Sequence, residues 1–146
     1  MNKLTLLVVA LSLGALSGCG AAPPPVARTA ACDRAAPALD ELAQTAFFLQ
    51  HFRTGGDAYR GHADLVDARA ARIGGAPADQ EASRVLDGVR QAAGIMSTKL
   101  RAAAETDSEQ GHQAVRQSAD GLRAALDQAG EVCGRTFSPF PPQQQH

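Results

Sequence analysis

The sequence predicts an all-α fold: an antiparallel up-down four-helix bundle stapled by one disulfide, with a disordered N-terminal tether and a disordered C-terminal tail. Three observations lead to this prediction. Tryptophan is absent and aromatic residues make up only 4 % of the chain, whereas alanine, the best helix former, is abundant. Apolar residues recur at spacings of three and four in four separate segments. Cys32 and Cys133 lie near the two ends of the region that these segments cover.

Glycine, proline and capping residues separate the four helical segments. The first helix is predicted to begin between Asp33 and Pro37, since Asp caps helices and Pro suits a first turn. It is predicted to end near Arg53, before Thr54-Gly55-Gly56, whose glycines suit a left-handed stop. Asp57 is the predicted cap of the second helix, which Gly74-Gly75 closes, and Pro77 opens the third.

The fourth helix has its own start signal, because Thr106-Asp107-Ser108-Glu109 has the S/T-x-x-E form of a capping box. It is predicted to run to Cys133. No segment alternates with period two, so we expect no strands. The residues expected in the core are Leu39, Leu42, Ala46 and Leu49; Tyr59, Ala63, Val66, Ala70 and Ile73; Ala82, Val85, Val89, Ala93, Met96, Leu100 and Ala103; and Val115, Ala119, Leu122, Leu126, Ala129 and Cys133.

The first nineteen residues carry a targeting signal. Lys3 is followed by an apolar run from Leu4 to Leu16 that is too short to span a bilayer, and the run ends Leu16-Ser17-Gly18-Cys19. This segment resembles the signal peptide and lipobox of a bacterial lipoprotein precursor. The resemblance implies cleavage before Cys19, a diacylglyceryl group on its thiol and an acylated N-terminus. It therefore implies a lipid-anchored protein of the cell envelope, facing the periplasm or the exterior. In that family Asp after the lipidated cysteine commonly retains the protein at the inner membrane, so Gly20 implies the outer membrane in a host with two membranes.

Four parts of the chain follow from these signals. They are a lipoprotein signal peptide (1–18), a lipidated cysteine with a Pro-rich tether (19–31), the helical bundle (32–137) and a disordered tail (138–146). The removed leader has Lys3 as its one charge, so the mature chain keeps 13 of the 14 basic residues beside 15 acidic ones, a net charge of −2. Nucleic-acid binding asks for clustered basic residues, so no nucleic-acid partner is expected.

The remaining cysteines, Cys32 and Cys133, predict a disulfide, because exported chains form and retain disulfides. A metal or redox pair is the alternative, although neither cysteine belongs to a Cys-x-x-Cys motif. Short loops make sequential helices antiparallel. An even number of helices then brings the start of the first helix and the end of the last to one end of the bundle, within bonding distance.

No catalytic motif accompanies these features: HExxH, G-x-S-x-G, Walker A and G-x-G-x-x-G are all missing from the sequence. We therefore expect a non-enzymatic interaction or structural module. Its partners would be the membrane, through the lipid on Cys19, and either another envelope protein or a second copy. No cofactor is expected apart from that covalent lipid.

The alternative is a module that binds a metal or a small ligand. His51, His62 and His112 are predicted to lie at the bundle end opposite the disulfide, and imidazole suits Zn, Cu or Ni. The helix phase turns His51 away from its apolar stripe, which leaves His62 and His112 as the candidate ligands. Histidines solvated near loops are the competing interpretation.

The aromatic residues of the first helix are a candidate contact patch. Phe47 and Phe48 diverge by about 100° on a helix, so they cannot both enter one narrow core. Phe52 lies one turn beyond Phe48. Either these rings form a surface for a partner, or the tether or the Phe137–Phe140 tail covers them.

Overall fold

The computed structural model describes residues 25–74, 79–137 and 139–140, and within these ranges it contains four helices and no strand. The helices are α1 (Pro25–His51), α2 (Gly56–Ala71), α3 (Gln80–Thr106) and α4 (Glu109–Cys133). The predicted all-α fold with four helices is therefore confirmed.

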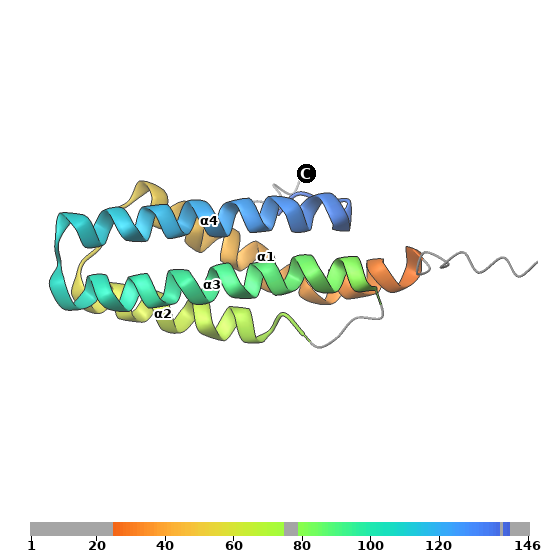
Figure 1. Ribbon diagram of the computed structural model, residues 1–146, viewed down its shortest axis with the longest axis horizontal. Coiled ribbons are helices and arrows are strands. Elements are labelled where there is room, and N and C mark those ends of the chain that lie inside the picture. The colour runs from red at the N-terminus through yellow and green to blue at the C-terminus, as the bar shows by residue number, and fades with distance from the viewer. Residues whose placement is uncertain (1–24, 75–78, 138, 141–146) are drawn as a thin grey trace, which may run out of the picture.

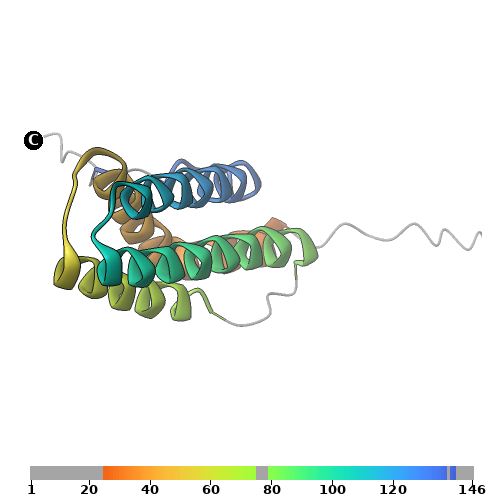
Figure 2. The ribbon, with the colours of Figure 1, turned by 60° about the vertical axis from the view of Figure 1, so that its left-hand side comes forward.

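The helices run up and down in sequence order, as Figure 1 shows. α3 packs along both α2 and α4, and α1 packs mainly against α4 and more loosely against α2. The backbones of α2 and α4 do not approach each other, so these two helices lie diagonally across the bundle. The α1–α2 and α3–α4 connections meet at one end, called here the loop end (Figure 2).

The core consists of the predicted apolar stripes. Alanine fills many of its positions, which allows close helix packing around a few larger side chains. Ala70 and Cys133 are only partly buried, whereas the other stripe positions are buried. The largest fully buried side chains are Leu39, Leu42, Leu49, Ile73, Met96, Leu100, Leu122, Leu126, His112, Val66, Val89 and Val115.

The disulfide joins Cys32 to Cys133, with 5.6 Å between their Cα atoms. It links α1 to the last residue of α4, at the end of the bundle opposite the loop end. Arg28 reinforces the same end: its Nε lies 2.7 Å from Asp79 Oδ2 and its Nη2 2.7 Å from Glu81 Oε2. The start of α1, the start of α3 and the end of α4 therefore lie together, as the even helix number predicts.

The predicted start of the first helix is wrong, because α1 begins at Pro25 instead of between Asp33 and Pro37. Residues 25–31, assigned from the sequence to the tether, are helical. Tertiary contacts explain the difference, since Ala31 and Cys32 are buried and Arg28 is paired with the start of α3. Pro25 is tolerated because a first-turn residue has no intrahelical hydrogen bond to lose. Pro37 lies inside α1, and residues 19–24 lie outside the described ranges.

The predicted capping box at Thr106–Glu109 is also wrong, because α3 continues through Thr106 and Ser108 caps α4. The Ser108 hydroxyl accepts a hydrogen bond from the Gly111 N–H at 3.1 Å. A Cβ at Gly111 would lie 3.3 Å from Ala103 Cα, so the glutamate of a box centred on Ser108 would crowd α3. Likewise, Gly55 and not Asp57 caps α2.

The chain beyond α4 folds back onto the bundle. Gly134 ends the helix in the left-handed region, with φ at 65°, and Phe137 is 2 % exposed against the core. The Phe137 ring lies 3.8 Å from the place where a Cβ on Gly130 would be. The bundle therefore extends to residue 137; residues 138 and 141–146 of the predicted tail lie outside the described ranges.

Candidate functional site

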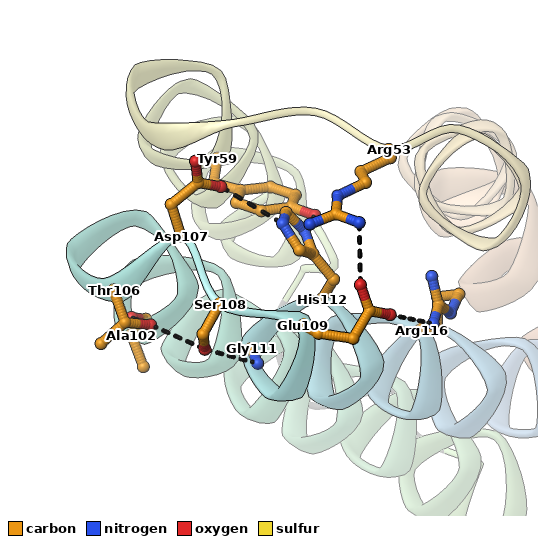
Figure 3. A network of polar contacts seen from close by, with 10 residues as sticks. All are labelled: Arg53, Tyr59, Ala102, Thr106, Asp107, Ser108, Glu109, Gly111, His112 and Arg116. Atoms are coloured by element: carbon orange, nitrogen blue, oxygen red, sulfur yellow. Dashed lines mark hydrogen bonds and ion pairs between the residues drawn. The ribbon is translucent and has the colours of Figure 1, made fainter.

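The polar side chains at the loop end form the candidate functional site, because they join both connections of the bundle (Figure 3). Tyr59 comes from the first turn of α2 and His112 from the first turn of α4. Asp107 lies in the α3–α4 connection, and Arg53 in the α1–α2 connection. The site therefore brings together segments that are about fifty residues apart in the sequence.

A hydrogen bond between Tyr59 and His112 is the centre of this site. The Tyr59 hydroxyl lies 2.5 Å from His112 Nδ1, and each residue is 2 % exposed. The two long side chains bridge α2 and α4, whose backbones do not meet. A hydroxyl that donates to Nδ1 leaves the imidazole proton on Nε2. Nε2 makes no hydrogen bond in acceptable geometry, although Asp107 Oδ1 lies 3.2 Å away.

The position of Asp107 depends on an uncommon backbone conformation. Its φ is 40°, and it is the one non-glycine residue with positive φ among the described residues. Its N–H closes the end of α3 by donating to the Ala103 carbonyl at 2.9 Å. Aspartate enters the left-handed region more easily than most residues. This turn directs the exposed carboxylate toward the buried imidazole of His112.

A set of ion pairs surrounds the buried pair. Arg53 Nη1 lies 2.8 Å from Glu109 Oε2, and Arg116 Nη2 lies 3.4 Å from Glu109 Oε1. The charge of Arg53, followed by the hydrogen bond from Arg116, holds the pKa of the Glu109 carboxyl below its ordinary value. All three side chains are exposed, so these pairs orient the loops more than they stabilise the fold.

The arrangement is suited to structural support and poorly suited to catalysis. Burial raises the pKa of Tyr59, while the charges of Arg53 and Arg116 oppose the rise. Tyr59 therefore remains a protonated donor at neutral pH. A substrate would have to reach groups that are 2 % exposed. The geometry supports a tie between the two connections of the bundle.

The other histidines lie apart from this pair in their contacts. His62 packs against Phe48, with ring centroids 5.3 Å apart, and burial, followed by the charge of Arg69, lowers its pKa. His51 is exposed, its Nδ1 lies 2.8 Å from the Phe47 carbonyl oxygen, and its ring stacks on Phe47. Within the ranges that the structure describes, no three or more His, Cys, Asp or Glu side chains converge in a way that would hold a metal ion.

The predicted aromatic patch divides into two contacts. Phe48 and Phe52 stack at 5.0 Å, and Phe52 is 54 % exposed. Phe47 is half-buried and meets Phe140 edge to face at 5.2 Å. The tail thus packs against Phe47, while Phe52 leaves apolar surface open to solvent.

Sequence reasoning missed the burial of His112, which it expected to flank the apolar stripe of its helix. The signal was present, because His112 continues the stripe of Val115, Ala119 and Leu122 by one step of three. The Tyr59 ring covers the end of that stripe and supplies the hydrogen-bond partner. A polar residue at a stripe position near a helix start can therefore be buried when another connection covers it.

The predicted lipidation residue, Cys19, lies outside the described ranges. Among residues 25–74, 79–137 and 139–140, no helix has both the length and the apolarity that crossing a membrane requires. No family model matches the chain, and no curated protein or solved structure similar to it was found.

Proposed function

We propose that this chain is a lipid-anchored, non-catalytic protein of the bacterial cell envelope, whose helical bundle contacts other envelope components. The observation that carries the proposal is a lipobox, Leu16-Ser17-Gly18-Cys19, ahead of a domain closed by a disulfide. Disulfides persist in oxidising compartments and are rare in the cytosol, so the Cys32–Cys133 bond supports export independently of the leader.

The position of the anchor fits the shape of the bundle. α1 begins at Pro25, six residues after Cys19 in the sequence. The Arg28 pairs with Asp79 and Glu81 hold the start of α1 to the start of α3. A membrane attached at Cys19 would therefore lie near the disulfide end, and the loop end would point away from it.

The non-catalytic part of the proposal has support from the loop-end site. The Tyr59–His112 pair is buried, so its geometry suits holding the bundle together. Phe52 offers exposed apolar surface at the same end for a contact with a partner.

Acyl labelling tests the proposal directly. The full chain, made in a bacterial host with labelled fatty acid, should carry label, appear in the membrane fraction and lose residues 1–18. Cys19→Ser should abolish labelling and cleavage. Ser17→Ala keeps a small residue in the lipobox and should retain both, which makes it the matched control. Labelling and processing unchanged by Cys19→Ser would refute the anchor.

The alternative, a module that binds a metal or a small ligand, keeps one observation in its favour. His112 Nε2 is buried without a hydrogen bond, 3.2 Å from Asp107 Oδ1. Calorimetric titration of the full chain with Zn²⁺ and Cu²⁺ tests it. Binding no tighter than that of a His62→Ala, His112→Ala double variant would exclude these residues as ligands.

A further inference from the structure

The outer surface of α3 and α4 contains an apolar groove that the loop-end site does not use. The two helices run side by side over most of their length (Figure 2). The groove has a volume of about 310 Å³. The residues that line it, called here the α3–α4 face, are Gly88, Gln91, Ala92, Ile95, Gln117, Ser118 and Gly121.

This face lacks ionised side chains, whereas three other hollows on the described surface contain them. One polar pocket contains Arg116 and Asp120, and another contains Glu131 and Arg135. On α4 the uncharged side continues by helical spacing from Gln110 to Gln128. On α3 the nearest cations on the same side are Arg84 and Lys99, one turn beyond each end of the Gly88–Ile95 stretch.

Ile95 projects from the α3–α4 face next to its groove. Its side chain is 50 % exposed beside a groove floored by small residues. A Cβ added at Gly88 or Gly121 would meet no atom within 4 Å, so this fold does not need glycine at either position. Glycine inside a helix is less stable than alanine. At these two positions it leaves open the space that an approaching apolar side chain would fill.

We propose that the α3–α4 face binds the same face of a second copy of this chain, with Ile95 of each copy in the partner's groove. The absence of charged side chains in the groove favours a second copy as the occupant, because a two-fold pair brings identical residues together and like charges would repel. Glutamine suits self-contact as well, since each amide has both donors and an acceptor. Gln91 and Gln117 can therefore pair across the contact with their own counterparts.

The size of the face sets the strength of the contact. The uncharged side is roughly 27 Å long on α4, from Gln110 to Gln128, but only about 20 Å long on α3, between Arg84 and Lys99, at 1.5 Å per residue and about 10 Å of width per helix. Each copy would then contribute roughly 470 Å², and the pair about 900 Å², which is just below the range of stable interfaces and within that of weak ones. We therefore expect a reversible dimer. Confinement of copies to one membrane would raise their effective concentration and favour it.

The test is sedimentation of the full chain in detergent micelles over a range of concentrations. The wild type should pass from monomer to dimer. A Gly88→Ala, Gly121→Ala variant should raise the dimer Kd about tenfold or more, because two methyl groups fill each groove. Its thermal midpoint should nevertheless rise by roughly 4 °C per substitution, since alanine favours a helix. An unstable monomer therefore cannot explain the lost dimer.

A second variant pair provides the control. Gly61 and Gly94 also lie in helices, and a Cβ at either position meets no atom within 4 Å, but neither lines the groove. Gly61→Ala, Gly94→Ala should raise the thermal midpoint and leave the dimer Kd unchanged. Ile95→Gln should weaken the dimer as the groove variant does.

Two results would overturn the assignment of a second copy. One is a wild-type chain that stays monomeric at every concentration, even if the chain binds a different envelope protein and the groove variant does not. The other is a dimer with the same Kd in the groove and control variants. Neither result bears on acylation of Cys19, which the labelling experiment decides separately.

Discussion

Removal of the disulfide should lower the stability of the bundle by a large and calculable amount. Cys32 and Cys133 are separated by 101 positions in the sequence. In the chain-entropy model, cross-linking a loop of about 100 residues removes roughly 4.7 kcal/mol of unfolded-state entropy at 25 °C. The effect matters here because alanine fills many core positions, and each such position buries less apolar surface than leucine would.

The expected change in thermal midpoint follows from the size of the bundle. A domain of about 110 residues unfolds with an entropy of roughly 0.23 kcal/mol per kelvin. A loss of about 4.7 kcal/mol therefore lowers the midpoint by about 20 °C. The helices should survive at low temperature, because the four apolar stripes remain in place after Cys32→Ser with Cys133→Ser.

Circular dichroism at 222 nm during heating measures this shift in the double variant and in reduced wild type. Unreduced wild type is the control, since it differs from the double variant only at Cys32 and Cys133 and from the reduced protein only in the bond between them. A midpoint lowered by less than about 5 °C would refute the entropic argument. Mass mapping that finds two free thiols in protein recovered from the envelope would refute the bond and weaken the argument for an even number of helices that uses it.

Three further substitutions test individual contacts. Gly130→Ala should destabilise the fold by about 1–3 kcal/mol in urea, because its Cβ would lie 2.5 Å from the Arg135 carbonyl oxygen; an unchanged urea midpoint would contradict this packing. Tyr59→Phe should cost about 1–3 kcal/mol by leaving His112 Nδ1 buried without a partner, and no added cost in a His112→Ala background would confirm the coupling. The hydrogen bond from Arg28, followed by those from the backbone N–H groups of Ala82 and Glu81, lowers the pKa of Asp79 below 3.8. The wild type should therefore lose stability as the pH falls through that lowered value. Asp79→Asn should flatten this loss, and an equal acid response in both proteins would exclude Asp79 as its source.

The sequence predicted the interior of the bundle well, for a physical reason. A buried helix face requires apolar residues at spacings of three and four, so stripes such as Val85, Val89, Ala93 and Met96 identify it directly. The two cysteines supported the even number of helices that the four segments predicted, because their bond requires both chain ends at one end of the bundle. These inferences depend on local periodicity and on one long-range constraint, the cysteine pair, and both can be recognised from the sequence alone.

Features that depend on distant contacts were not predicted. The early start of α1 depends on the pairing of Arg28 with residues about fifty positions later, which periodicity does not reveal. The cap of α4 was misplaced because Thr106 and Ser108 are both acceptable capping residues, and local sequence does not reveal that α3 continues through Thr106. The burial of His112 was not predicted, because the ring that covers it, Tyr59, comes from another helix.

The proposed lipid anchor and the proposed pairing through the α3–α4 face constrain each other. Copies held in one leaflet through Cys19 would point the same way, so the two-fold axis that relates a pair would stand along the membrane normal. If the bundle rises from its disulfide end, that axis runs parallel to the helices, and each residue meets the partner at its own height. Ile95 and Gly121 line the same groove, so they already lie at nearly the same height. Parallel pairing therefore brings Ile95 of one copy to the glycine-lined groove of the other without sliding either bundle along its axis.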